Sequence, residues 1–242
     1  MSEKPRILVI GAGCIGTVHA QNAAVLGQAA IIDQNVDEAK EKADQLGIQS
    51  FGSSLEKALQ WPPDGVVVAV PNRFHVPIAE QVLAAGVPVM VEKPISMDLE
   101  DATRLVAFAK SRQLPLFVVS NMRFHPAVQV LRRNITSIGK PLFARAHFGN
   151  YLPSMRPGVD YKKLYVADKD EGGVVLDGIH ELDYLSWLLG PIERSIGVAA
   201  QLGDLEIEAE DYASMIFWHR DNVKSELHLD FLRPHKRRGC EI

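Results

Sequence analysis

The sequence is poor in cysteine and has no long apolar segment. Cys14 and Cys240 are the only two cysteines among 242 residues, too few for a disulfide framework or a zinc module, so a reducing compartment is expected. No run approaches 18 apolar residues, and the apolar stretch Ile7–Ile10 is too short for a signal-peptide core. These absences predict a cytoplasmic protein without a transmembrane helix.

A strong charge of either sign is also absent. Lys and Arg number 26 and Asp and Glu number 30, which gives a formal net charge of -4 and argues against nucleic-acid or membrane partners, since both are anionic. The hydrophobic share is 47% and the charged share 23%, as in globular proteins, which excludes a disordered, collagen-like or coiled-coil chain.

Apolar runs alternate with segments of helical spacing in the first half of the chain. This alternation predicts βαβ units and a parallel sheet covered by helices on both faces. Ile48–Phe51 is a candidate for a further edge strand. The expected strands are Ile7–Ile10, Ala29–Ile32, Gly65–Val70, Val87–Val91 and Leu116–Val119. The expected helices are Ile15–Leu26, Asp37–Leu46, Ser54–Leu59, Val76–Ala85 and Leu99–Ser111.

The pattern changes near residue 120, where Asn121–Pro126 forms a junction. We therefore predict two domains: residues 1–120 as an α/β dinucleotide-binding domain, and residues 121–242 as an α+β domain for substrate and oligomer contacts. The second is expected to hold helices from about 126 to 135 and 173 to 189, and a strand at Leu142–Gly149. Its last predicted strands, Ser195–Leu202, Tyr212–Trp218 and Val223–Phe231, have no helix between them, so their sheet is expected to be mainly antiparallel.

A glycine motif follows the first predicted strand. Gly11, Gly13 and Gly16 match G-x-G-x-x-G and open a helix, which is the context that a dinucleotide site requires. Gly11 permits the turn, Gly13 lets the backbone approach a pyrophosphate, and Gly16 lets the helix pack on the strand. Asp33, at the end of the second strand, can accept hydrogen bonds from the ribose of NAD and would repel the additional phosphate of NADP. NAD is therefore the favoured cofactor. The alternative interpretation is that the glycine motif is an ordinary βα turn that binds no cofactor.

Three further motifs complete a recognisable set. They are Pro71-Asn72-Arg-Phe-His75 after the expected strand Gly65–Val70, Glu92-Lys93-Pro94 after the expected strand Val87–Val91, and the helix segment GGVVLDGIHELD at 172–183. With the glycine fingerprint and the NMRFHP junction, this sequence resembles the Gfo/Idh/MocA family of NAD(P)-dependent sugar and cyclitol oxidoreductases over essentially its whole length. It looks most similar to members of bacterial surface-polysaccharide biosynthesis.

The resemblance implies a Rossmann domain and hydride transfer between the nicotinamide and a secondary alcohol or ketone of a sugar. It implies that Lys93 is the catalytic lysine, that His180 is the acid/base and that Asp177 contributes a carboxylate; it also suggests a cis Lys93–Pro94 bond. His is suited to accept a hydroxyl proton near neutral pH, and a lysine can stabilise alkoxide charge. Asp177 and His180 are three residues apart, where the inositol branch has four, and either spacing puts the pair on one helix face. Asp183 is an alternative orienting partner for His180.

The remaining site predictions concern cofactor and substrate. Cofactor contacts are expected from Gly11, Gly13, Cys14, Ile15, Gly16, Asp33, Pro71, Asn72, His75, Glu92 and Lys93. Substrate contacts are expected from Arg123, Tyr151, Arg156, Tyr161 and Tyr165. Most of the latter lie in the long segment Tyr151–Glu171, whose cations and tyrosines suit an anionic, nucleotide-linked sugar; packing on a neighbouring subunit is the other interpretation. Asp177, His180 and Asp183 lack a second His or Cys at ligand spacing, so no metal is predicted.

The C-terminal part leaves alternatives open. The chain stops where another strand would begin, so the second sheet is expected to be incomplete, with an edge for a homo-oligomer partner. A non-catalytic dinucleotide-binding sensor or scaffold on the same fold is therefore the alternative to an enzyme. The basic run Arg233–Arg238 would suit a third function, nucleic-acid binding, but in a net acidic chain it is more typical of a guarded strand edge.

Overall fold

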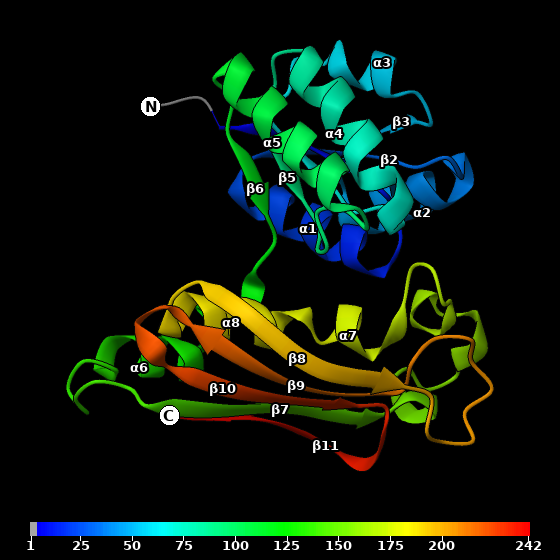
Figure 1. Ribbon diagram of the computed structural model, residues 1–242. Coiled ribbons are helices and arrows are strands. Elements are labelled where there is room, and N and C mark those ends of the chain that lie inside the picture. The colour runs from blue at the N-terminus through cyan, green and yellow to red at the C-terminus, as the bar shows by residue number, and fades with distance from the viewer. Residues whose placement is uncertain (1–3) are drawn as a thin grey trace. The chain divides into compact units, whose positions relative to one another are not determined.

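The computed structural model describes residues 4–242, which divide into two compact units, one ending at Val119 and the other beginning at Ser120. Each unit is built on its own sheet: sheet A in unit 1 and sheet B in unit 2 (Figure 1). Among the described residues, no helix has both the length and the apolar character needed to cross a membrane.

Sheet A is a six-stranded parallel sheet in the order β3-β2-β1-β4-β5-β6. Its strands are β1 Arg6–Ile10, β2 Gln28–Ile32, β3 Gln49–Gly52, β4 Gly65–Val68, β5 Val89–Val91 and β6 Leu116–Val118. The connecting helices are α1 Cys14–Leu26, α2 Val36–Leu46, α3 Leu55–Leu59, η1 Asn72–Phe74, α4 His75–Ala84 and α5 Leu99–Arg112. The predicted parallel α/β fold is therefore confirmed, and β3 is the edge strand expected near Ile48–Phe51.

Alternate residues along each strand of sheet A enter two separate cores. On β1, Leu8 and Ile10 pack with α3, α4 and α5, whereas Val9 packs with α1 and α2. All three side chains are buried because helices cover both faces. This double burial explains why the strands read as continuous apolar runs in the sequence.

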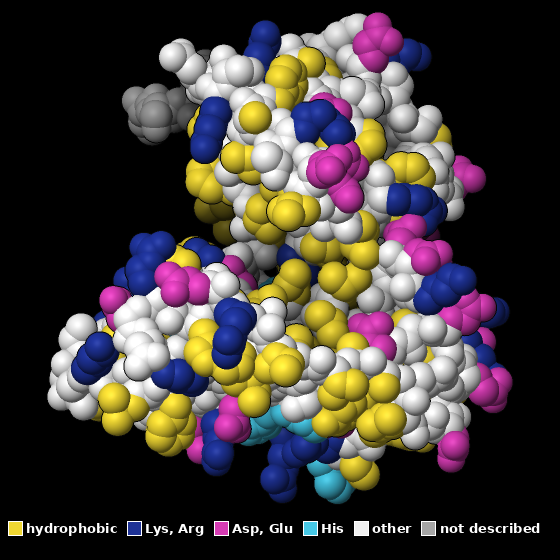
Figure 2. Space-filling view, viewed as in Figure 1, with side chains coloured by type: hydrophobic (Ala, Val, Ile, Leu, Met, Phe, Trp, Pro, Cys, Tyr) yellow, Lys and Arg dark blue, Asp and Glu magenta, His cyan; other side chains and the backbone are white. Residues whose placement is uncertain are grey.

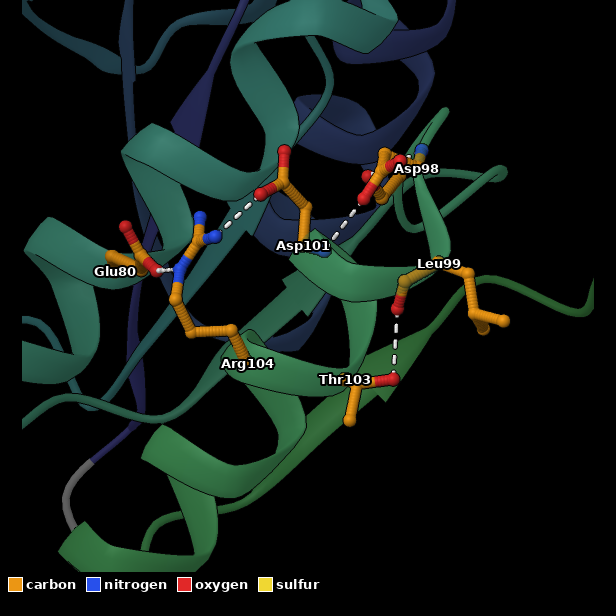
Figure 3. A network of polar contacts seen from close by, with 7 residues as sticks. Glu80, Asp98, Leu99, Asp101, Thr103 and Arg104 are labelled. Atoms are coloured by element: carbon orange, nitrogen blue, oxygen red, sulfur yellow. Dashed lines mark hydrogen bonds and ion pairs between the residues drawn. The ribbon is translucent and has the colours of Figure 1, made fainter.

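Polar side chains fix the start of α5, the helix that follows the Glu92-Lys93-Pro94 segment. Asp98 accepts a hydrogen bond from the backbone N–H of Asp101 at 2.9 Å, which caps the helix (Figure 3). Arg104 joins α5 to α4 by an ion pair with Glu80 at 3.0 Å, and it also pairs with Asp101. These contacts tie the two helices that cover the same face of sheet A.

Sheet B is mixed, in the order β11-β7-β10-β9-β8, with β7 and β10 parallel and the other pairs antiparallel. Its strands are β7 Phe143–Tyr151, β8 Ile192–Ala200, β9 Tyr212–His219, β10 Lys224–Asp230 and β11 Leu232–Glu241. The helices of unit 2 are η2 Asn121–Phe124, α6 Pro126–Asn134, η3 Leu152–Ser154, η4 Tyr161–Lys163, η5 Tyr165–Ala167, α7 Gly173–Asp177, α8 Ile179–Leu189 and η6 Arg220–Asn222. The prediction of a mainly antiparallel second sheet is confirmed.

One face of sheet B carries the core of unit 2, in which Leu227, Leu229 and Phe217 pack against Tyr184 and Leu185 of α8. On the other face, Ile196 of β8 lies directly opposite Ile216 of β9, and both are exposed together with Val198. Viewed as in Figure 1, apolar side chains come to the surface in the region of these strands (Figure 2). This face has an apolar strip that the described residues leave uncovered.

Candidate active site

The glycine loop of unit 1 has the geometry that a dinucleotide phosphate requires. Gly11 has a φ of +108°, and a Cβ there would lie 2.1 Å from the Ala69 carbonyl oxygen. A Cβ on Gly16 would lie 1.9 Å from the Gly11 carbonyl oxygen, so the first turn of α1 packs directly on the loop. A Cβ on Gly13, by contrast, would meet no described atom within 4 Å. The loop therefore packs tightly on the protein at Gly11 and Gly16, whereas Gly13 leaves space in which a ligand can approach the backbone.

Asp33 is held beside this loop at the end of β2. One carboxylate oxygen accepts a hydrogen bond from the Ala12 N–H at 2.7 Å, and the other accepts from the Asn35 N–H at 2.8 Å. The side chain lines a cavity of about 230 Å³. The cavity is formed by Ile10, Gly11, Ile32, Asp33, Gln34, Ser53, Leu55, Val70, Pro71, Phe74, Ile78 and Gln81. These residues fit the adenosine half of NAD: apolar walls for the base, a fixed carboxylate for the ribose and, in this lining, no Lys or Arg to hold a 2′-phosphate.

The segment Glu92-Lys93-Pro94 follows β5 at the carboxyl edge of sheet A. The Lys93–Pro94 peptide is cis, as the family resemblance suggests. Glu92 contacts His19 of α1, with 2.8 Å between Oε1 and Nε2, and its other oxygen accepts a hydrogen bond from the Lys93 N–H at 3.1 Å. Polar contacts therefore hold the backbone on which half-buried Lys93 stands.

His75 is not among the residues that line the Asp33 cavity, and its contact with the cofactor stays a prediction. Its side chain is 1% exposed at the start of α4. Nδ1 lies 2.7 Å from the Pro94 carbonyl oxygen and Nε2 lies 2.9 Å from that of Val70. Both ring nitrogens therefore contact carbonyl groups inside unit 1, and His75 joins the segment after β4 to the segment after β5.

The segment that carries Asp177 and His180 is broken where one continuous helix was expected. α7 ends at Asp177, Gly178 interrupts the helix and α8 begins at Ile179. A Cβ on Gly178 would lie 2.6 Å from Leu229 of β10, so the glycine lets this turn approach sheet B. Asp177 and His180 therefore belong to two helices, which corrects the prediction that they share one helix face.

Asp177 nevertheless has a partner from the predicted substrate loop. The Tyr165 hydroxyl donates a hydrogen bond to Asp177 Oδ1 at 3.1 Å, and both side chains reach solvent. α7 itself begins against Glu210, whose carboxylate accepts from the Val175 N–H at 3.1 Å and whose carbonyl accepts from the Val174 N–H at 3.0 Å. The structure thus brings one predicted catalytic residue and one predicted substrate residue together.

The other substrate candidates lie in varied settings. Arg123 makes two hydrogen bonds to Asp183 of α8, at 2.8 and 2.6 Å, and this pair raises the pKa of Arg123. Because Asp183 accepts from Arg123 with both oxygens, it serves as an anchor for α8. Tyr161 packs against the core of unit 2, whereas Tyr151 and Arg156 are exposed.

The residue after His180 forms an ion pair with β11. Glu181, the next residue on α8, is 0% exposed, and its Oε1 lies 2.7 Å from Nε of Arg238 on β11. The Arg238 guanidinium also stacks over Phe148 and donates to the Met122 sulfur at 3.4 Å. Burial, only partly offset by Arg238, raises the pKa of Glu181 to about 7.

Sequence reasoning missed His19, Glu210 and the pair Glu181–Arg238. Each acts through a partner far away in the sequence, so no local motif marks it. Only Glu181 has a sequence signal that could have revealed it: the helical spacing puts this residue on the apolar side of α8. Within residues 4–242, no three His, Cys, Asp or Glu side chains gather in a way that could hold a metal ion.

Family models match both units of this chain. The model described as "Oxidoreductase family, NAD-binding Rossmann fold" matches residues 5–120, and the GFO/IDH/MocA C-terminal domain matches residues 129–242. The chain belongs to the Gfo/Idh/MocA family. The NAD-binding domain of this family is the unit that holds the Asp33 cavity, so the cofactor is NAD, as predicted.

Several Gfo/Idh/MocA relatives are dehydrogenases. UDP-N-acetylglucosamine 3-dehydrogenase of Acidithiobacillus ferrooxidans is 34% identical over 79% of this chain and 58% of its own length. Myo-inositol 2-dehydrogenase of Thermotoga maritima is 30% identical over 84% of this chain and 60% of its own length. This chain thus spans about three fifths of the length of these relatives.

A solved relative has the same fold over nearly the whole chain. The WlbA dehydrogenase of Bordetella pertussis, in complex with NADH and UDP-GlcNAcA, superposes with a TM-score of 0.86 at 26% identity. The superposition covers 98% of this chain and 69% of that one.

Proposed function

We propose that this protein is an NAD-dependent oxidoreductase that transfers a hydride between the nicotinamide and a secondary alcohol or ketone of a sugar nucleotide. The observation that carries the proposal is the Asp33 cavity beside Gly13, where a Cβ would meet no described atom, in a unit that also carries Lys93 just after β5. The names of the relatives above support the reaction class.

The catalytic roles follow from the chemistry of the side chains. Bound NAD supplies the hydride acceptor. His180 takes the hydroxyl proton as the carbon gives up its hydrogen with the electron pair, which leaves a ketone. The Lys93 ammonium stabilises the negative charge that develops on the oxygen. Asp177, held by Tyr165, lies next to the turn that starts α8 and supports the charge on His180.

The substrate is proposed to be an anionic sugar nucleotide. Tyr151 and Arg156 are exposed in the 151–171 segment, and Tyr165 reaches Asp177 from it. Arginine suits phosphate or carboxylate groups, and tyrosine rings stack on sugars or bases. Substrate binding by Arg123 requires its guanidinium to keep Asp183 while it turns remaining donors outward.

The protein is further proposed to assemble with a second copy of itself through sheet B. The support is the exposed strip formed by Ile196, Val198 and Ile216 on the face away from the core. Sedimentation velocity tests this: Ile216→Lys is expected to shift the assembly to monomers, and a wild-type chain that sediments as a monomer at micromolar concentration contradicts it.

A fluorescence titration with NADH, with NADPH in parallel, tests the cofactor half of the proposal. Saturable binding with a clear preference for NADH is expected. The exposed Cys14, inside the glycine loop, offers a second readout, because bound NADH should protect it from a maleimide. Cys240 is the internal reference, since burial raises the pKa of its thiol to about 11 and keeps it unreactive in both states.

Turnover tests the chemical half. UDP-GlcNAc and its uronic acid, UDP-GlcNAcA, are the first substrates to assay, and Lys93→Ala or His180→Ala should abolish the reaction. Tight NADH binding without turnover on any sugar nucleotide would favour a dinucleotide sensor or scaffold. Absence of NADH binding would overturn the proposal.

A further inference from the structure

His19 joins the nucleotide-binding helix to a strand end 73 residues away. It lies on α1, the helix that opens at Gly13, and its side chain is 15% exposed. Its Nε2 lies 2.8 Å from Oε1 of Glu92, the residue that follows β5. This contact crosses from the helix of the first βα unit to the segment that carries Lys93.

The carboxylate of Glu92 is bound on both oxygens. The second oxygen accepts from the Lys93 N–H at 3.1 Å, and the backbone N–H of Glu92 itself donates to the Val68 carbonyl at 2.9 Å. Burial alone would favour the neutral acid. The hydrogen bonds from His19 and Lys93 more than offset it, so the pKa of Glu92 lies below its ordinary value. The bridge between α1 and the Lys93 backbone is therefore an ionised group, and hydrogen bonds to such a group are strong.

The far side of the same segment is fixed independently. The Pro94 carbonyl oxygen lies 2.7 Å from Nδ1 of the buried His75 on α4. His75 therefore holds one side of the segment that carries Lys93. On the other side of this segment, the Glu92 side chain contacts His19 of α1.

We infer that His19 is a positioning residue: acting through Glu92, it fixes the Lys93 strand end to the helix that begins at the nucleotide loop. The inference rests on the proposed function, because it gives Lys93 a fixed place beside a cofactor that α1 binds. Loss of the contact should disturb both the binding of NADH and the position of the Lys93 amine.

Five variants test this in the full chain. His19→Leu removes the donor, and His19→Gln restores an N–H at a similar reach. Glu92→Gln removes the charge, and the double variant His19→Leu/Glu92→Gln closes a double-mutant cycle. Gln21→Leu, an exposed position on the same helix, is the matched control.

Two readouts are measured on each variant: the Kd for NADH, and the labelling rate of Lys93 by reductive methylation relative to Lys57 and Lys110 in the same peptide map. The second needs neither substrate nor turnover. His19→Leu is expected to weaken NADH binding about 10-fold, the scale of one hydrogen bond to a charged group. It should also change the relative labelling rate of Lys93. His19→Gln should restore both quantities, and Gln21→Leu should leave them unchanged.

The double-mutant cycle decides whether His19 acts through Glu92. The double variant should lose no more affinity for NADH than whichever single variant binds NADH more weakly. The positioning role would be overturned if the fold-losses in NADH affinity of the two single variants multiplied in the double variant. It would also be overturned if Lys93 were labelled at the same rate in wild type and His19→Leu. In either case, NADH binding by the wild type would leave the proposed function standing. A wild-type chain that binds no NADH would overturn both.

Discussion

The two units hold their candidate site residues by different means. In unit 1 the candidate residues stand on strand ends: the glycine loop and the end of β2 place Asp33, and the end of β5, with one polar contact from His19 to Glu92, places the Lys93 segment. In unit 2 the support is ionic: Arg123 pairs with Asp183 and Arg238 pairs with Glu181. Both carboxylates lie on α8, the helix that carries His180. The difference indicates that unit 2 is the more sensitive to single charge changes.

The sharpest test of that comparison is Arg238→Met, which leaves the Glu181 carboxylate buried without its cation. The free energy of unfolding is expected to fall by up to about 3–5 kcal/mol at pH 8, where the Glu181 carboxyl group is ionised, and by less at pH 6, where it is protonated. Urea denaturation measures the loss. The exposed cross-strand pair Arg145–Glu226 provides the control, since Arg145→Met should leave stability close to the wild-type value.

Arg238→Met/Glu181→Leu should recover most of that stability, because an apolar pair needs no compensation for lost hydration. If Arg238→Met and Arg145→Met lost the same amount, the buried pair would not be the special support of α8.

The pH dependence of stability gives the next largest effect. Glu181 has a folded pKa of about 7 against an ordinary 4.5, so the folded state holds a proton that the unfolded state releases. That stabilisation is complete below pH 4.5 and is lost as pH rises through 7, about 3 kcal/mol in all, most of it between pH 5 and pH 8. The free energy of unfolding, measured by denaturation at several pH values in this range, should fall more steeply with pH in wild type than in Glu181→Gln. Parallel profiles would contradict the raised pKa.

In unit 1 the corresponding test is Asp33→Ser, which should affect the ligand more than the fold. NADH binding is expected to weaken at least about 10-fold, because a charged acceptor for the ribose is lost. NADPH binding should weaken less, since the repulsion of its phosphate is also lost. Asp37→Ser, on the first turn of α2, is the matched control for a nearby acidic residue. An unchanged NADH to NADPH preference in Asp33→Ser would remove Asp33 from cofactor selection.

The smallest effect is expected for Arg104→Ala, which breaks the ion pairs of α5 with Glu80 and Asp101. These side chains are solvent-exposed, so the unfolding midpoint should stay within the error of the wild-type measurement. A large loss would show that the ion pairs of Arg104 stabilise unit 1, and it would remove the difference in charge sensitivity between the units.

The contrast also explains what the sequence could predict. The fold of unit 1 and its cofactor loop follow from local pattern, because apolar runs, glycine spacing and Asp33 lie within a short segment. The break at Gly178 was missed because it depends on Leu229 of β10. The burial of His75 was missed for a similar reason, since its partners include the Pro94 carbonyl on another strand end.

The parallel pairing of β10 with β7 and the pairing of β11 with β7 were also beyond the sequence pattern. Strand periodicity shows which residues share a face, but not which strand will be the neighbour. For β11, the basic run Arg233–Arg238 masked the strand, although its residue Arg238 turns out to reach the buried Glu181.

The contact between Glu210 and the start of α7 has a consequence for local motion. Val174 and Val175 donate their amide hydrogens to Glu210, and a Cβ on Gly173 would collide with its carboxylate. The 201–211 segment therefore cannot lift away without exposing those amides to water and loosening the helical turn that ends at Asp177. The hydrogen-exchange rates of the Val174 and Val175 amides therefore report how often the 201–211 segment opens. Each such opening would loosen the helical turn that carries the candidate catalytic carboxylate of Asp177.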